Sequence, residues 1–287
     1  MARWVLGSRW VRRLAAGVAC GVVVAAALAL ADRRWGPARA FHRAEVAWEG
    51  GEYRRAAALF QRTADRYPGH PLAAEALYRV GRVNYLFLRD VREAVHALRG
   101  VARSRDAGPW GREAQRLLGE IFEQRQDDCR QAIVEYQRFI QMDPAGEGND
   151  AAQLAVARCS FVLREFDQAR AEYETLLERY AESPLLAEAL VGLGAAAAVT
   201  GRTELALRSY RRARTAAADP GLGAEASFGI AAALEASGDL AGALVEFETA
   251  LATHPNPEIV ARRIVLVRGR MEQQGPRTGG SHGGRGD

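Results

Sequence analysis

An alanine followed four residues later by a large apolar residue recurs six times along the chain. The pairs are Ala56/Phe60, Ala94/Leu98, Ala132/Tyr136, Ala169/Tyr173, Ala206/Tyr210 and Ala243/Phe247. Successive pairs are separated by 38, 38, 37, 37 and 37 residues. Such regular self-similarity is the signature of a chain made of repeated supersecondary units that stack on one another. The sequence therefore predicts six stacked units.

The residues around each alanine extend the same pattern. Three residues before it stand Tyr53, Val91, Cys129, Phe166, Thr203 and Leu240, and seven residues after it stand Thr63, Val101, Phe139, Leu176, Ala213 and Ala250. Positions −3, 0, +4 and +7 lie on one face of an α-helix. We interpret this face as the buried stripe of the second helix of each unit, with a small alanine where two helices approach closely.

The first helix of each unit has signals of its own. Gly81, Gly119 and Gly194 lie in apolar helical stretches, and Gly51, Gly201 and Gly238 are turn residues before second helices. Asp150 is predicted to cap the fourth unit, and Ser183-Pro184 and Asp219-Pro220 open or precede the next two. The predicted fold is all-α, a right-handed superhelical solenoid of helix-turn-helix repeats over residues 37–257. A capping helix is expected at 258–274, and a Gly-rich disordered tail at 275–287.

These units resemble tetratricopeptide repeats, whose pattern has Gly in the first helix, Gly-x-Tyr at the turn, Ala and an aromatic residue in the second helix, and Pro at the end. Gly51-Glu52-Tyr53, Ala56, Phe60 and Pro68 match it, as do Gly238-Asp239-Leu240, Ala243, Phe247, Ala250 and Pro255. The usual repeat has about 34 residues, so the longer units here imply longer loops.

Residues 50–85 are similar to bacterial cell-envelope members of that family, which include outer-membrane assembly lipoproteins and the periplasmic Tol-Pal coordinator. The similarity lies in the link between repeats, Tyr67-Pro68-Gly69-His70-Pro71-Leu72-Ala73. Grooves that bind chaperone tails need a Lys and Asn pair where this chain has Phe41 and Glu45. The resemblance implies an envelope scaffold rather than a chaperone adaptor.

An uncharged run of 18 residues, 14–31, follows a basic segment, 1–13, and precedes a short linker, 32–36. As a helix it is about 27 Å long, close to the thickness of a bilayer core. Trp10 and Trp35 flank it, as in an interfacial belt. We predict an uncleaved transmembrane anchor; a cleaved signal peptide is the alternative. A lipid-modified Cys20 is disfavoured, because Gly17 stands where a lipoprotein signal has Leu.

The basic leader favours a cytoplasmic N-terminus, so the expected location is the bacterial inner membrane with the repeats in the periplasm. The charge of the chain is concentrated in that leader. The first 31 residues hold four Arg and no acid, which leaves 35 Arg against 35 Asp and Glu. A neutral body lacks the basic face that binds phosphate backbones, so no nucleic acid is expected.

Residues with catalytic or metal-binding potential are scattered. The five His have no His or acid partner at a productive spacing, and Cys20, Cys129 and Cys159 form no CxxC motif. A Cys129–Cys159 bridge is one option in an oxidising compartment. We expect no enzyme activity, catalytic residue, cofactor, metal or small-molecule substrate.

Stacked first helices in this family form a concave groove that binds peptides or partner helices. Aligning the units on the family pattern places Tyr78, Arg82, Tyr85, Arg116, Glu120, Arg158 and Phe161 at groove positions. The hypothesis is a basic and aromatic track for an extended peptide with carboxylate groups. The expected function is a membrane-anchored protein-interaction scaffold of the envelope; the alternative is a cleaved periplasmic coordinator or outer-membrane assembly factor.

Overall fold

The structure, a computed structural model, describes residues 3–125 and 127–274, without the side chains of residues 3–17, 19, 21, 28, 29 and 31. The chain divides into two compact units, residues 1–126 and 127–287. Helices account for almost all of the described residues, and none of these residues lies in a β-strand. The all-α prediction is confirmed for this part of the chain.

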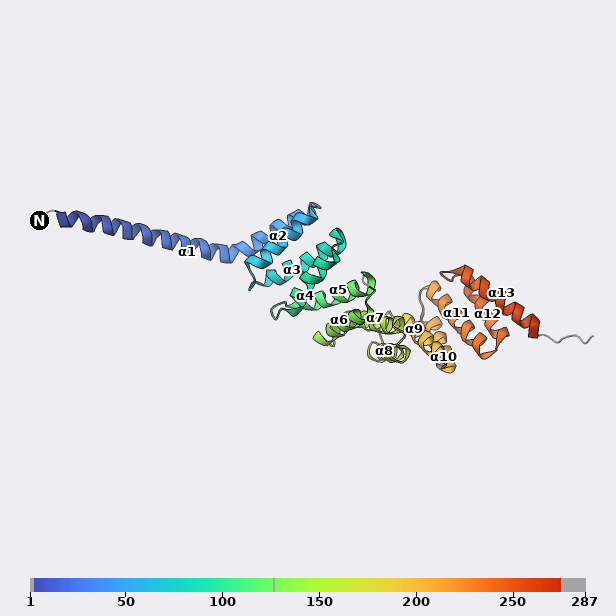
Figure 1. Cartoon of the computed structure of the whole chain (residues 1–287). Helices are drawn as coiled ribbons and strands as arrows, with labels where there is room; N and C mark the ends of the chain where they lie inside the picture. Colours follow the sequence, from blue (N-terminus) through green and yellow to red (C-terminus); the bar gives the residue numbers. More distant parts are fainter. Residues whose placement is uncertain (1–2, 126, 275–287) are drawn as a thin grey trace, which may run out of the picture. The chain divides into compact units, whose positions relative to one another are not determined.

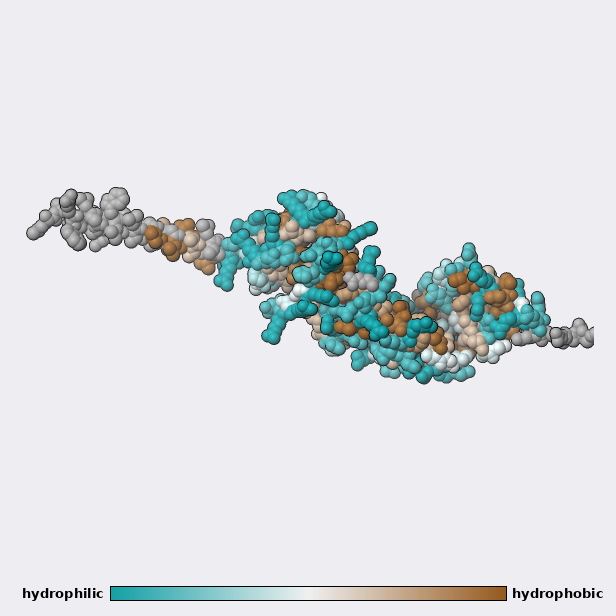
Figure 2. All heavy atoms as spheres, in the orientation of Figure 1, coloured by the Kyte–Doolittle hydropathy of each residue, from teal (hydrophilic) through white to brown (hydrophobic). Residues whose placement is uncertain are grey.

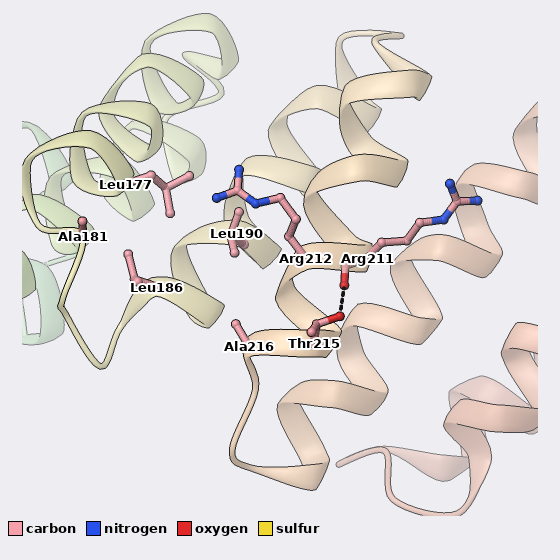
Figure 3. A pocket seen from close by; sticks show the side chains of 8 residues that line it. All are labelled: Leu177, Ala181, Leu186, Leu190, Arg211, Arg212, Thr215 and Ala216. Carbon is pink, nitrogen blue, oxygen red and sulfur yellow. Dashed lines mark hydrogen bonds between the residues drawn. The ribbon is translucent and has the colours of Figure 1, made fainter.

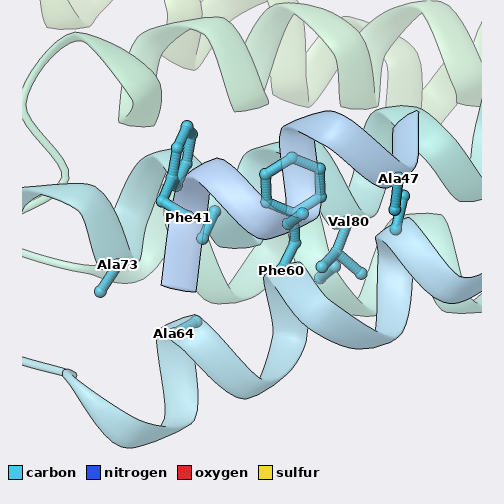
Figure 4. Close-up of a cluster of buried hydrophobic side chains, with 10 residues drawn as sticks. Phe41, Ala47, Phe60, Ala64, Ala73 and Val80 are labelled. Carbon is cyan, nitrogen blue, oxygen red and sulfur yellow. The ribbon is translucent and has the colours of Figure 1, made fainter. Parts of the chain in front are cut away.

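The first unit contains α1 (Arg3–Glu49), α2 (Tyr53–Arg66), α3 (Pro71–Val83), α4 (Val91–Arg103) and α5 (Pro109–Arg125), and a π-helical turn, η1 (Asn84–Leu88), extends α3 (Figure 1). Each helix packs against the next. Figure 4 shows the resulting core, in which Phe41 of α1 and Phe60 of α2 lie among alanines and Val80 of α3. Consecutive helix pairs with a shared apolar seam are the arrangement that the repeat predicts.

The second unit continues with eight described helices. They are α6 (Cys129–Met142), α7 (Asn149–Val162), α8 (Phe166–Arg179), α9 (Leu186–Val199), α10 (Thr203–Ala216), α11 (Pro220–Ser237), α12 (Leu240–Leu251) and α13 (Pro257–Gln274). Here too each helix packs on its successor. The last helix, α13, begins at a proline and buries Val260, Ile264 and Val267 against α11 and α12. It covers the apolar face that α12 would otherwise expose.

The predicted stripe is confirmed at positions 0, +4 and +7 of all six second helices. At position −3 only Cys129 and Leu240 are buried, and the other four residues are half-buried. Helices α2, α4, α6, α8, α10 and α12 each begin at the predicted −3 residue. All six alanines have no exposed surface, and the residues four and seven positions later are buried. The pairwise packing in each unit is that of a tetratricopeptide-type solenoid, whereas the right-handed superhelix stays a prediction.

Glycines of the first helices allow the close helix approach. A Cβ at Gly81 would come within 2.5 Å of the Leu98 side chain, and one at Gly194 within 2.7 Å of the Tyr210 ring. Both distances are far shorter than van der Waals contact, so any side chain there would push the two helices apart. The large residue at position +4 therefore packs directly on the backbone of the first helix.

Turns and caps follow the sequence signals in part. Gly51, Gly201 and Gly238 adopt φ values of 75°, 73° and 92°, as turn residues do. Asp219 caps α11 by accepting a hydrogen bond from the Leu222 N–H, with proline next in the chain. The prediction for Asp150 is wrong, because α7 starts one residue earlier and Gly148 is its N-cap. Asp150 instead accepts a hydrogen bond from Ser183.

The linker predicted at 32–36 is helical, because α1 runs without a break from Arg3 to Glu49. Pro37 lies inside the helix, near the start of the part that forms the first repeat. Asp32 accepts hydrogen bonds from Arg66 at 2.9 Å and from the Tyr67 hydroxyl at 3.1 Å. These hydrogen bonds attach residues 32–36 to the end of α2. The composition of the segment does not predict this contact.

No helix in the described part of the chain carries an apolar stretch long enough to cross a bilayer. Half of the side chains in the predicted segment 14–31 lie outside the described ones. Val22, Val23, Val24 and Leu30, which are described, are all exposed, and Figure 2 shows hydrophobic residues on this part of the molecule. The predicted tail, 275–287, lies outside the described residues.

The tight contact at Ala169 leads to a first prediction. Ala169 of α8 is fully buried among Leu154, Ala157 and Leu193 of the neighbouring helices. We expect Ala169→Leu to lower the free energy of unfolding of the second unit by about 1–3 kcal/mol, because the added atoms overpack the contact. Hydrogen exchange of the α7–α9 amides measures it. Ala171→Leu on the exposed side of α8 is the control; equal effects of the two variants would disprove the assigned register.

Candidate partner-binding surface

The first helices of the N-terminal unit lie next to one another. Helix α3 contacts both α1 and α5 in addition to the second helices. Four of the predicted groove residues of this unit lie on α3 and α5: Tyr78, Arg82, Arg116 and Glu120. The α1–α3–α5 face is therefore the counterpart, within this unit, of the predicted groove.

Arginine and aromatic side chains alternate across this face. The guanidinium groups of Arg79 and Arg82 lie 5.5 and 5.7 Å from the ring centre of Trp48, near the end of α1. Arg82 also lies 6.0 Å from the ring of Tyr78, which packs against Trp110 of α5 at 5.1 Å. Burial raises the pKa of Tyr78, so its hydroxyl stays neutral at physiological pH. The cation–π contacts hold the arginines in place at the surface.

Arg116 already has two carboxylate partners. Its guanidinium pairs with Glu113 at 3.0 Å and with Glu120 one turn away. Burial alone would lower the pKa of Arg116, but the two carboxylates together raise it above its ordinary value. The local charge of this trio is negative. The prediction that Arg116 offers a free guanidinium group to a carboxylate ligand is therefore corrected, since a ligand would have to displace a glutamate.

Tyr85 also differs from the prediction. It lies buried in the η1 turn, and the guanidinium of Arg125 stands 5.8 Å from its ring centre. The next two residues of η1, Leu86 and Phe87, are exposed instead, and Phe87 stacks on Tyr53 at 4.0 Å. The π-helical turn, which is uncommon and often occurs at functional sites, thus turns an apolar pair outward. Tyr85 supports the fold, and Phe87 is available for contact.

The other two predicted residues, Arg158 and Phe161 of α7, belong to the second unit. Arg158 forms an ion pair with Glu188 of α9 at 3.1 Å. Phe161 packs edge-on against Phe166 at the start of α8, with ring centres 5.2 Å apart. Arg158 is therefore neutralised, as Arg116 is, and the three arginines do not form a track of unpaired positive charges.

Sequence reasoning missed Trp48, Trp110 and Arg79. The repeat pattern is strongest in the second helices, whereas both tryptophans lie at the ends of first helices. A useful signal was available, because tryptophan and arginine are the residues most enriched where protein partners bind tightly.

A second surface lies in the C-terminal unit, in a cleft of about 510 Å³. Its lining is mostly apolar and comes from α8, α9, α10 and the loop after α8: Leu177, Ala181, Leu186, Leu190, Thr215 and Ala216, with Arg211 and Arg212 at the edge. Figure 3 shows the Arg212 guanidinium turned toward the leucines and that of Arg211 pointing away. Among the described residues neither arginine has an ion-pair partner. The cleft is a second candidate surface for protein contact.

The described residues contain no group of His, Cys, Asp or Glu side chains that could hold a metal ion. Cys129 and Cys159 are buried and form no disulfide, and Cys20 is exposed. The optional bridge between Cys129 and Cys159 is thus not formed.

Paired helices with a recurrent small-residue seam, and partly exposed tryptophan and arginine side chains on the first-helix face, define a helical-repeat protein of the protein-binding class. The family model of the tetratricopeptide repeat matches residues 41–87, 83–147 and 157–222, more than half of the chain. The chain therefore belongs to the tetratricopeptide-repeat family. Proteins of this family are generally non-catalytic scaffolds.

Solved structures share the fold at low sequence identity. MamA matches with a TM-score of 0.52 and 21% identity over 61% of this chain and 94% of its own. PilW, described as a widely conserved type IV pilus biogenesis factor, matches with 0.52 and 17% identity over 79% and 98%. The apo form of RapI matches with 0.51 and 13% identity over 83% and 99%. No curated protein sequence matches significantly.

Proposed function

We propose that this protein is a non-enzymatic scaffold of the bacterial cell envelope, anchored by the apolar part of α1, that binds segments of partner proteins. The observation that carries the proposal is the α1–α3–α5 face, where Trp48 and Tyr78 flank Arg82. Large aromatic rings and arginine supply most of the binding energy at protein interfaces. Arg82 has no carboxylate partner among the described residues, so its charge is available to a ligand.

The chemistry of this face favours an extended peptide with an acidic side chain or a C-terminal carboxylate. The carboxylate would bind Arg82, and apolar side chains of the peptide would pack on Trp48 and the exposed ring of Phe87. The ion pairs of Arg79 with Glu75 and of Arg116 with Glu113 and Glu120 limit the positive charge on the face. A single carboxylate therefore suits the face better than a run of acids.

The anchor is supported by the length of the uncharged run 14–31 and by its exposed apolar side chains. Val22, Val23, Val24 and Leu30 are more than half exposed, so the described part of the chain leaves them to water, lipid or another protein. Exposed valines and leucines in a row are costly in water, at about 25 cal/mol per Å². The resemblance to envelope proteins supports a periplasmic repeat domain; a cleaved, soluble periplasmic coordinator is the alternative.

The binding proposal predicts that Arg82→Ala weakens capture of partner proteins from envelope extracts at least about tenfold, since loss of a charged anchor typically costs ~2 kcal/mol. Quantitative affinity capture with the full chain measures the change. Arg92→Ala, an exposed arginine on α4, is the matched control and should have no effect. Loss of capture in Arg212→Ala but not in Arg82→Ala would place binding in the α8–α10 cleft and refute the assignment.

The anchor proposal predicts that the protein remains in the membrane fraction at high salt and alkaline pH. An apolar helix of this length partitions too strongly to be extracted under conditions that remove peripheral proteins. Sequencing the mature N-terminus completes the experiment. A soluble protein beginning near residue 30 would establish the cleaved alternative.

A further inference from the structure

The part of α1 that follows the uncharged run 14–31 packs beside the end of α2. A polar cleft of about 320 Å³ opens there between α1 and α2. Arg39 and Arg43 line it from α1, Arg66 lines it from the last turn of α2, and Asp32 and Tyr67 complete it. A second hollow of about 490 Å³ shares Asp32, Arg66 and Tyr67 and adds Arg33. Four arginines therefore line two hollows that share three residues, although residues 32–287 as a whole hold as many acids as arginines.

The charges in this cleft do not balance. Asp32 is its only carboxylate, and it accepts the hydrogen bonds from Arg66 and Tyr67. The hydrogen bond from Arg66 lowers the pKa of Asp32, so this carboxylate is ionised at neutral pH. Arg39 and Arg43, one helical turn apart, have no ion-pair or hydrogen-bond partner among the described residues. Three guanidinium groups against one carboxylate leave an excess of two positive charges around an open space.

The position of the cleft along α1 indicates which kind of anion could reach it. Arg39 follows Ala31, the end of the uncharged run, by eight residues, about 12 Å along the helix. If the run spans the bilayer, the cleft lies beside the headgroup layer, and the long arginine side chains can reach back toward it. Trp35, which is half exposed about one helical turn after the run, suits the same interface.

We propose that Arg39, Arg43 and Arg66 bind the phosphate of an anionic phospholipid headgroup in this cleft. Guanidinium groups bind phosphate oxygens through paired hydrogen bonds, and three of them can surround one phosphate from two helices. The lipid would connect α1 to α2 and so fix the first repeat at the membrane surface. This inference rests on the proposed membrane anchor.

Asp32 has a definite role in the proposed site. Its carboxylate occupies Arg66 and repels an incoming phosphate, so it competes with the ligand. Replacing it by asparagine keeps the size of the side chain and releases the guanidinium. Asp32→Asn should therefore bind the anionic lipid more tightly than the unaltered protein, a gain that loss of structure cannot produce.

Titration calorimetry of the purified full chain in nonionic detergent tests the proposal. The probes are dihexanoyl phosphatidylglycerol, dihexanoyl phosphatidylcholine and inorganic phosphate. We expect the anionic lipid to bind at least about tenfold more tightly than either of the others, Arg39→Gln/Arg43→Gln to lose about tenfold in affinity, and Asp32→Asn to gain. Arg54→Gln/Arg62→Gln removes two exposed charges from α2 outside the cleft and should bind as the unaltered protein does.

Equal binding of the two lipids, or an unchanged affinity in Arg39→Gln/Arg43→Gln, would overturn the proposal. Inorganic phosphate binding as tightly as the anionic lipid would make this a site for free phosphate and would also overturn it. Circular dichroism of each variant verifies that the helices are intact. Alkaline extraction tests the anchor separately, so a soluble protein would refute the anchor, whereas a retained protein with no lipid preference would refute only this site.

Discussion

Phe60→Ala is expected to lower the free energy of unfolding of the N-terminal unit by about 3–5 kcal/mol, a large part of the stability of a small domain. Phe60 has no exposed surface and packs edge-on against Phe41 at 5.2 Å and Trp48 at 6.2 Å. Figure 4 shows its ring near the centre of the cluster formed by α1, α2 and α3. Removing the ring leaves a cavity that these helices cannot close without losing their register.

Hydrogen exchange of the α2 and α3 amides in the full chain measures this loss where it occurs. Phe60→Leu is the matched control, because Leu98 fills the equivalent position of the next repeat and leucine recovers much of the volume. We expect it to cost less than half as much as alanine. Similar losses for the two variants would show that the aromatic contacts, rather than the filled volume, stabilise the unit.

The buried face of the second helices could be predicted from the sequence, because positions 0, +4 and +7 recur at a fixed spacing in each of them. Burial restricts these positions to small or apolar residues, and six occurrences of the same pattern exclude a chance match. First helices are less constrained. One side of each first helix is covered by a neighbouring helix and the other side forms the groove, so the sequence pattern of first helices is weaker. Their N-caps are also harder to predict, as Asp150 shows.

The groove side chains could be placed on the correct helices but not in their correct surroundings. Arg116 and Arg158 lie on first helices as predicted, yet glutamates one turn away or on the next first helix neutralise them. Ion pairing depends on rotamers and on neighbours about 30 residues away, which a repeat alignment does not contain. Of the three arginines, only Arg82, whose guanidinium lies over the ring of Trp48, has no carboxylate partner among the described residues.

Helix α13 leads to the second large prediction. Removing residues 257–287 is expected to destabilise α11 and α12 by about 5 kcal/mol or more, because Val260, Ile264 and Val267 each contribute ~1.5–3 kcal/mol of apolar burial. Phe247 and Leu240 of α12 would then face water. In a repeat protein, the free energy of unfolding is the sum of the stability of each repeat and of its contacts with neighbouring repeats. The loss should therefore be largest in α12 and should decline toward α6.

The substitution Glu235→Gln tests how much the ion pairs between α11 and α13 contribute to stability, because it leaves the apolar contacts of α13 in place. Glu235 of α11 is nearly buried and accepts hydrogen bonds from both Arg263 and Arg270 of α13, at 2.6 and 2.7 Å. Losing the charge while α13 still covers α12 should cost only about 1–3 kcal/mol. Hydrogen exchange of the α12 amides compares the two variants in the same protein.

If the truncated chain protects α12 as well as the full chain does, α13 is not the cap, and the apolar end of the repeats must be covered by another molecule. If Glu235→Gln is as damaging as the truncation, the ion pairs rather than the three apolar side chains hold α13 in place.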